Sequence, residues 1–153
     1  MKELEDIVKT KSKLQLSKRT ILNVFITNTM FKEEMQAVLK PFDLSMEQFN
    51  VLRILRGQKG NPLNLQDIQE RMVSKMSNTT RLVDKLITKE YAERHTCEKN
   101  RRKVEIFITK TGLELLTKLD IIIDDSETQL TSNLSNQELE QLNILLNKLR
   151  TQT

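Results

Sequence analysis

The stretch that decides the fold runs from Leu65 to Thr109 and reads LQDIQERMVSKMSNTTRLVDKLITKEYAERHTCEKNRRKVEIFIT. Apolar residues at steps of three and four predict two short helices in its first half. A strand is predicted from Tyr91 to Cys97, and alternating apolar and polar residues predict a second from Lys103 to Thr109. Because four cations lie at positions 99, 101, 102 and 103 of the intervening tip, this order predicts a winged helix-turn-helix with a basic wing.

The two predicted helices each begin at a residue whose side chain can cap a helix. Asn64 precedes the first helix, and Ser74 precedes a second helix that we expect from Lys75 to Lys89. The residues expected to face inward are Leu65, Ile68 and Met72 in the first helix and Met76, Val83, Leu86 and Ile87 in the second.

The outward face of the predicted helix from Lys75 to Lys89 is polar and basic. An α-helix fits the major groove of DNA, where Asn and Arg can make paired hydrogen bonds with bases. Clustered cations at the wing tip repel one another unless phosphates lie nearby, and an arginine there can enter the minor groove. An ordinary polar helix face and a solvated turn remain the alternatives for each feature by itself. The predicted DNA-contacting residues are Lys75, Ser77, Asn78, Thr79, Arg81, Lys85, Lys99, Arg101, Arg102 and Lys103.

The charge of the 153-residue chain is unevenly distributed. The formal net charge of +4 divides into +2 for residues 1–70, +6 for 71–110 and −4 for 111–153. A basic middle and an acidic end predict one surface that faces a polyanion and another that faces away from it. No apolar run approaches the roughly 20 residues of a membrane span, and no signal peptide is evident, so we expect a cytoplasmic protein.

The flanking segments are strongly helical in pattern. A long amphipathic helix is expected over residues 14–40, and a capping box at Ser45 opens a helix that ends near Arg56. Thr109 is expected to cap a further long helix, and a second capping box at Ser135 opens a leucine-rich final helix. These apolar stripes exceed the needs of a small winged helix, which favours association between subunits; a monomeric core is the alternative.

The chain resembles the MarR family of bacterial transcription regulators over about residues 14–150. The matching segments, in family order, are 44–52, 65–72, 74–89, Asn100-Arg101-Arg102 and Ile108-Thr109-Lys110-Thr111-Gly112. The resemblance implies a mainly α fold with a small β-wing, in which dimerisation helices flank a winged helix-turn-helix. It implies an N-terminal dimerisation region over 1–43, a DNA-binding region over 44–110 and C-terminal dimerisation helices over 111–153.

Two positions depart from the family pattern, one at each end of the wing. Asn100 replaces the usual aspartate that helps to hold the wing arginine, and an amide cannot form the ion pair. Glu90 replaces a common glycine, so a positive φ at this position would strain the backbone.

The function expected from these features is sequence-specific binding of double-stranded DNA. We expect a ligand-responsive repressor that acts as a homodimer on a palindromic operator and answers to a small-molecule effector. The alternative is a helical interaction or scaffold protein whose basic wing binds an acidic partner. We expect no enzymatic activity and no cofactor. The sequence offers neither a phosphate-binding glycine loop nor a set of catalytic partner residues for its single histidine.

Several residues could take part in regulation, but a role without regulation is favoured for each. Met30, Phe31, Phe49 and Arg53 could line an effector cleft, although core or helix-junction positions suit them better. Cys97 at the wing base could be a redox sensor only with a lowered pKa. His95 lies two positions away, but one histidine and one cysteine are too few ligands for a zinc site, so no metal is expected.

Overall fold

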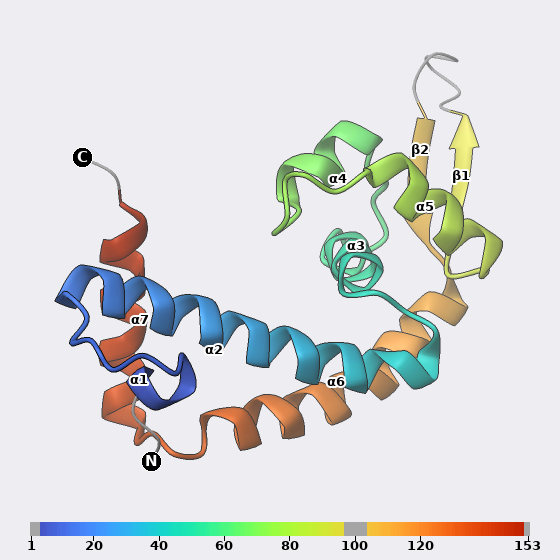
Figure 1. Ribbon diagram of the computed structural model, residues 1–153. Helices are drawn as coiled ribbons and strands as arrows, with labels where there is room; N and C mark the ends of the chain where they lie inside the picture. Colours follow the sequence, from blue (N-terminus) through green and yellow to red (C-terminus); the bar gives the residue numbers. More distant parts are fainter. Residues whose placement is uncertain (1–3, 97–103, 152–153) are drawn as a thin grey trace.

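A computed structural model of the protein describes residues 4–96 and 104–151. Within these ranges the chain is mainly α-helical with one two-stranded sheet, as the sequence predicts (Figure 1). The elements are α1 (Leu4–Ile7), α2 (Leu16–Leu39), the 3-10 helix η1 (Lys40–Phe42), α3 (Met46–Arg56), α4 (Leu65–Arg71), α5 (Thr79–Thr88), β1 (Ala92–Thr96), β2 (Val104–Ile108), α6 (Lys110–Thr131) and α7 (Asn136–Arg150).

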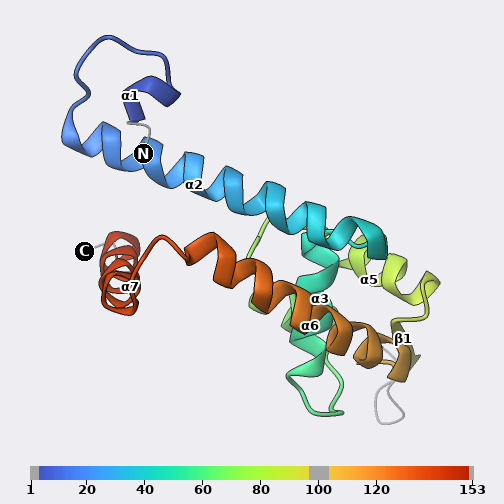
Figure 2. The same cartoon turned by 90° about the horizontal axis from the view of Figure 1, so that it is seen from below.

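The molecule has two parts with different shapes. Elements α3 to β2 form a compact unit, which we call the winged-helix lobe. Helices α2 and α6 run side by side away from this lobe and α7 lies at their far end, so we call these three helices the helical arm (Figures 1 and 2). The predicted arrangement of a winged helix flanked by N- and C-terminal helices is therefore confirmed.

Helix α3 lies at the centre of the winged-helix lobe. Its residues Val51 and Leu52 are completely buried and belong to a hydrophobic core that includes residues from every other element of the lobe. The first half of α6 completes this core through Leu116 and Leu119. The fully buried side chains are Leu39, Val51, Leu52, Leu55, Ile68, Met72, Val83, Leu86, Ile106, Leu116 and Leu119.

The helix starts that local sequence predicts at Ser45, Thr109 and Ser135 are confirmed. The Ser45 hydroxyl accepts from the backbone N–H of Gln48 at 3.2 Å, and Gln48 accepts in return from the N–H of Ser45 at 3.0 Å. Ser135 forms the same box with Glu138, and the hydrogen bond from the Ser135 backbone lowers the pKa of that glutamate. Reciprocal caps satisfy donors that the first turn of a helix leaves free.

The sheet is an antiparallel hairpin that gains a short third strand-like segment. Ala92 pairs with Ile108 at the base, and Thr96 pairs with Val104 at the described end. Ile106 is buried, as the alternating pattern predicts. The backbone of Leu63 exchanges two hydrogen bonds with Ile106, at 3.1 and 2.8 Å, so the segment before α4 is joined to the wing.

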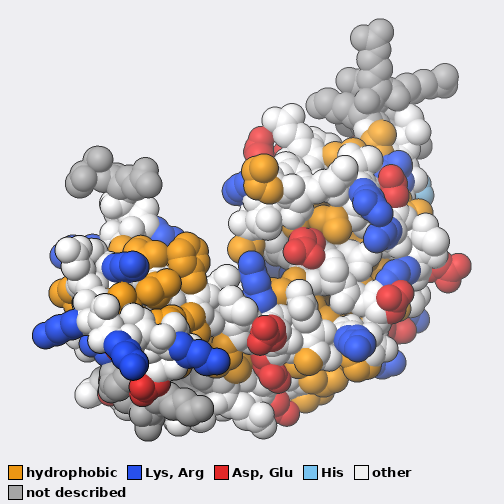
Figure 3. Space-filling model, viewed as in Figure 1, with side chains coloured by type: hydrophobic (Ala, Val, Ile, Leu, Met, Phe, Trp, Pro, Cys, Tyr) orange, Lys and Arg blue, Asp and Glu red, His pale blue; other side chains and the backbone are white. Residues whose placement is uncertain are grey.

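The helical arm leaves much of its apolar surface exposed. Helix α2 buries one of its residues, Leu39, and α7 buries none. Figure 3 shows hydrophobic side chains gathered over α7 and the neighbouring part of α2. Among the described residues, no helix is both long and apolar enough to cross a membrane.

Candidate nucleic-acid interface

Helix α5 begins later than the sequence predicts. The expected start at Lys75 with Ser74 as cap is wrong, because α5 begins at Thr79 and Asn78 is its cap. The Asn78 Oδ1 accepts from the backbone N–H of Arg81 at 3.1 Å. Residues 73–77 form an irregular turn instead of the first turn of a helix, so the connection between α4 and α5 is longer than the sequence predicts.

This turn is held in place by side chains from the two preceding helices. Asn50 of α3 accepts from the backbone N–H of Val73 at 3.0 Å. Gln69 of α4 donates to the carbonyl oxygen of Lys75 at 2.5 Å and accepts from the hydroxyl of Thr79. The amide of Gln69 therefore fixes both the turn and the first residue of α5. Sequence reasoning missed Asn50 and Gln69 as positioning residues, because each acts across a gap that local patterns do not reveal.

Two predictions about side-chain direction on this segment are corrected. Thr79 was expected to contact DNA, but it is 5% exposed and its hydroxyl is bonded to Gln69. Met76 was expected to face the core, but it is 95% exposed, because it precedes the helix whose period would have turned it inward. The inward direction of Val83 and Leu86, which do lie on α5, is confirmed.

Four of the predicted DNA-contacting residues lie together in one groove. This groove, of about 400 Å³, runs along the outward side of α5 and includes Ser77, Asn78, Arg81 and Lys85. Its other lining residues are Glu47, Ser74, Met76 and Leu82. Lys75 is exposed but does not line the groove, and its ammonium donates to the carbonyl oxygen of Glu70. The exposed side chains form a mixed surface of amide, guanidinium, ammonium and thioether groups.

The wing is braced against α5 by an ion pair. Arg94 of β1 donates to Asp84 of α5 at 2.7 Å, and both side chains are partly exposed. On the same strand, His95 packs edge-on against Phe107, with ring centroids 5.4 Å apart. The predicted contact residues Lys99, Arg101, Arg102 and Lys103, as well as Asn100 and Cys97, lie outside the described residues.

The junction between α5 and β1 has at Glu90 the positive φ for which the sequence predicts backbone strain. This residue has φ 60°, in the left-handed region, and it ends the helix. The backbone N–H of Tyr91 donates to Leu86 and that of Glu90 donates to Ile87, each at 2.9 Å. These two bonds form a Schellman motif, whose left-handed position is usually glycine.

A glycine at the start of α6 allows this junction to pack closely. A Cβ atom on Gly112 would lie 2.3 Å from the carbonyl oxygen of Tyr91. Beside it, Thr109 donates its hydroxyl to the carbonyl oxygen of Glu90 at 2.7 Å. The end of α5 and the start of α6 are therefore locked together at the base of the wing.

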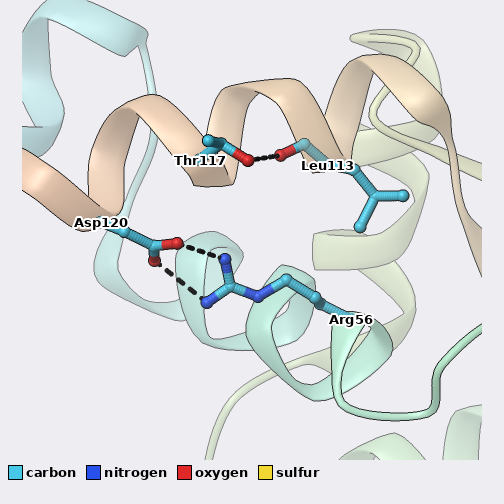
Figure 4. Close-up of polar contacts among 4 residues, drawn as sticks. All are labelled: Arg56, Leu113, Thr117 and Asp120. Atoms are coloured by element: carbon cyan, nitrogen blue, oxygen red, sulfur yellow. Dashed lines mark hydrogen bonds and ion pairs between the residues drawn. The ribbon is translucent and has the colours of Figure 1, made fainter.

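A second contact joins the winged-helix lobe to the helical arm. Arg56 at the end of α3 donates two hydrogen bonds to the carboxylate of Asp120 on α6, at 2.6 and 3.0 Å (Figure 4). These bonds hold the pKa of Asp120 below its ordinary value and raise that of Arg56. One turn earlier on α6, Thr117 bonds back to the carbonyl of Leu113, so it does not compete for Asp120 (Figure 4).

A third ion pair lies where α5 ends near η1. Lys89 donates to the Asp43 carboxylate at 2.6 Å, and this bond lowers the pKa of Asp43. The pair borders an open pocket of about 680 Å³ between α2, α3 and α5, which Lys40 and Lys85 also line.

The residues considered for an effector cleft have different surroundings in the described part of the chain. Phe49 is buried in the core, and the Arg53 guanidinium lies 5.7 Å from the centre of its ring. Phe31 borders a different groove of about 910 Å³, between α2 and α7, whose apolar lining includes Val24, Leu142 and Leu145. No group of three or more potential metal ligands occurs within residues 4–96 and 104–151.

Comparisons with known proteins find similarity to one family of regulators. Residues 44–104 match the model of the MarR family. The chain is 34% identical over 77 residues to the uncharacterized HTH-type transcriptional regulator YfiV of Bacillus subtilis. That match covers 50% of this chain and 47% of YfiV, so it spans about half of each protein.

Solved structures extend the similarity to nearly the whole chain. The MarR transcription factor from Planctomyces limnophilus is 27% identical with a TM-score of 0.70, over 89% of this chain and 98% of that one. Mutant Escherichia coli MarR complexed with operator DNA is 21% identical with a TM-score of 0.76, over 99% and 100%. Bordetella bronchiseptica BpsR, whose DNA binding is regulated by 6-hydroxynicotinic acid, is 18% identical with a TM-score of 0.79, over 93% and 100%.

The last two similarities, at 21% and 18% identity, show the fold alone. The names of YfiV and of the Planctomyces limnophilus protein describe transcription regulators. The matched segment 44–104 includes α3, α4, α5 and β1 of the winged-helix lobe and ends at the first residue of β2. Residues 44–104 of the chain are thus similar to the MarR family of regulators, and the described fold is that of the solved MarR structures.

Proposed function

We propose that this chain is a transcriptional regulator that binds double-stranded DNA sequence-specifically through the outward side of α5. The observation that carries the proposal is the groove shared by Ser77, Asn78, Arg81 and Lys85. An exposed helix with amide and guanidinium groups suits the donors and acceptors of the major groove. The similarity of residues 44–104 to the MarR family supports the same function, and such a protein would act in the cytoplasm, where the DNA of a bacterium lies.

Each residue of this surface has a distinct proposed role. Arg81 is exposed and free to donate a pair of hydrogen bonds to a guanine. Asn78 uses its side-chain oxygen to cap α5, so its amide nitrogen is the group left to donate to a base. Lys75 and Lys85 would contact phosphates, while the wing cations Lys99, Arg101, Arg102 and Lys103 would reach the backbone and the minor groove. Thr79 is left out because it is buried.

We propose that the regulator is a homodimer and that its operator is palindromic. The support comes from the helical arm, in which α7 exposes Leu142, Leu145 and Leu149 beside an apolar groove. A second copy of the same surface would remove these side chains from water. Two-fold symmetry would then set two α5 helices about one DNA turn apart.

We further propose that the protein is a repressor controlled by a small molecule. The DNA binding of BpsR, which shares the fold, is regulated by 6-hydroxynicotinic acid. The identity of the effector for this chain is left to experiment, and no residue is assigned to it.

Selection of bound sequences from random duplex DNA tests the proposal most directly. The selected site should be palindromic, and affinity for it should fall by about a thousandfold between 50 and 200 mM salt. Arg81→Ala should change the preferred sequence, whereas Arg102→Ala should weaken binding to all sequences and reduce the salt slope by about one. Lys118→Ala, which removes an exposed lysine from α6, is the matched control and should change neither property.

An absence of duplex binding at low salt would refute the proposal. Binding to an acidic polypeptide but not to DNA would support the alternative of a scaffold protein with a basic wing.

A further inference from the structure

An apolar side chain stands on the proposed DNA-reading surface without a partner in the protein. Met76 is 95% exposed and lines the same groove as Asn78 and Arg81. It is not a displaced core residue, because the inward face of α5 is already filled by Val83 and Leu86, which are completely buried. Single exposed apolar residues are common on protein surfaces, so it is the position of Met76 within the groove that calls for an explanation.

The backbone on both sides of Met76 is anchored. Lys75, which precedes it, accepts from Gln69 through its carbonyl oxygen at 2.5 Å. Ser77, which follows it, donates its backbone N–H to Ser74 at 3.3 Å, and Asn78 caps the helix. The thioether is therefore presented from a fixed turn immediately before the first turn of α5.

The major groove of DNA offers one apolar group among its polar edges, the 5-methyl group of thymine. The polar side chains beside Met76 can hydrogen-bond to polar base edges, but they make no favourable apolar contact with a methyl group. An unbranched thioether adapts to such a contact and gains from its removal from water. The groove thus combines polar groups with one exposed apolar side chain that lies at their edge.

We propose that Met76 contacts the 5-methyl group of a thymine in each half of the operator and makes this chain prefer thymine there. The inference rests on the proposed function, because it requires that α5 enter the major groove. It names a specificity-determining contact that the sequence pattern assigned to the protein core.

The test uses the full-length protein and the duplex obtained by selection from random DNA. Each thymine is replaced in turn by deoxyuridine, which removes the 5-methyl group and leaves the base pair intact. At one position in each half-site, this change should weaken the wild-type protein by about fourfold, the effect of losing one buried methyl group. Met76→Ala should bind the thymine duplex about as weakly and should no longer distinguish thymine from deoxyuridine at that position.

Val73→Ala is the matched control. Val73 is 88% exposed on the same turn, but it does not line the groove. This variant should keep the wild-type preference for thymine. The proposal is overturned if wild-type protein shows no position at which the methyl group matters, or if Val73→Ala removes the preference as fully as Met76→Ala does. Either result would leave sequence-specific binding itself intact, whereas failure of the initial selection would refute the proposed function.

Discussion

The winged-helix lobe and the helical arm use their apolar residues in opposite ways. In the lobe, α5 is only ten residues long, yet its two central inward residues, Val83 and Leu86, are completely buried. In the arm, α7 has fifteen residues and buries none of them, although leucines recur along one side. The lobe is complete within one chain, while the arm has apolar surface that one chain does not cover.

This difference separates two kinds of constraint on the sequence. Buried residues of the lobe pack against neighbours in the same chain, so their substitution should affect folding. In the proposed homodimer the exposed leucines of α7 contact the other copy, so their substitution should affect assembly first. The predictions below test this division.

The largest effect is expected for Leu145→Glu on α7. Leu145 lines the apolar groove between α2 and α7 and is 55% exposed. A carboxylate there would be buried without a partner in the proposed dimer, so we expect monomers and at least a hundredfold loss of affinity for the selected DNA site. Sedimentation and DNA titration measure the two effects.

Asn147→Glu is the control for this experiment, because it adds the same charge to α7 outside the groove. It should remain dimeric. If Leu145→Glu also stays dimeric and binds DNA normally, the exposed leucines are not an association surface.

A smaller effect, on folding, is expected for Gly112→Ala. The added Cβ would lie 2.3 Å from the carbonyl oxygen of Tyr91 and 2.9 Å from Ile108 Cγ1. We expect the free energy of unfolding to fall by about 2 kcal/mol, measured by denaturant titration. Gly57→Ala is the matched control, since its Cβ would meet nothing closer than 3.4 Å. Equal stability of the two variants would show that the junction accommodates the added methyl group with little loss of stability.

The ion pair between the lobe and the arm should contribute less and in a pH-dependent way. Asp120→Asn should lower stability by about 1 kcal/mol or less at pH 7, because both side chains of the pair are partly exposed. The pKa of Asp120 is lowered in the folded state, so its contribution is present above the ordinary value of 3.8 and is lost as pH falls through the folded pKa.

The measurement is the difference in melting temperature between wild type and Asp120→Asn. It should be constant from pH 5 to 8 and should shrink below about pH 4. A difference that persisted unchanged at pH 2 would contradict a charge-dependent link.

The smallest effect is a gain in stability for Glu90→Gly. Glycine relieves the left-handed strain at φ 60° but adds freedom to the unfolded chain, so the net gain is about 0.5 kcal/mol. Glu90→Ala keeps the strain and removes the charge, and it should change stability little. Thermal unfolding distinguishes the two, and a gain for alanine equal to that for glycine would assign the effect to charge.

The sequence predicts those features that depend on near neighbours. The caps at Ser45, Thr109 and Ser135 were predicted correctly because a hydroxyl and a residue three positions later suffice to form them. The left-handed strain at Glu90 was also predictable, from the departure from a family glycine.

The errors concern features that are decided by distant contacts. Ser74, Ser77 and Asn78 can each cap a helix, and the choice between them depends on Asn50 and Gln69, which hold the preceding turn. The burial of Thr79 against Gln69 and the pairing of Leu63 with Ile106 have the same origin. The predicted domain boundaries and the DNA-contacting residues that remain exposed stay predictions.

The two ends of α5 are fixed by different devices, the Asn78 cap and the Schellman turn at Glu90. Successive residues of an α-helix are rotated by about 100° around the helix axis. Inserting one residue between these ends would leave both anchors in place and rotate Arg81 relative to Lys85 or to the wing. In the proposed DNA complex, exchanging side chains on α5 would therefore alter the DNA preference without disturbing either anchor, whereas changing the length of α5 would displace its contact residues relative to one another.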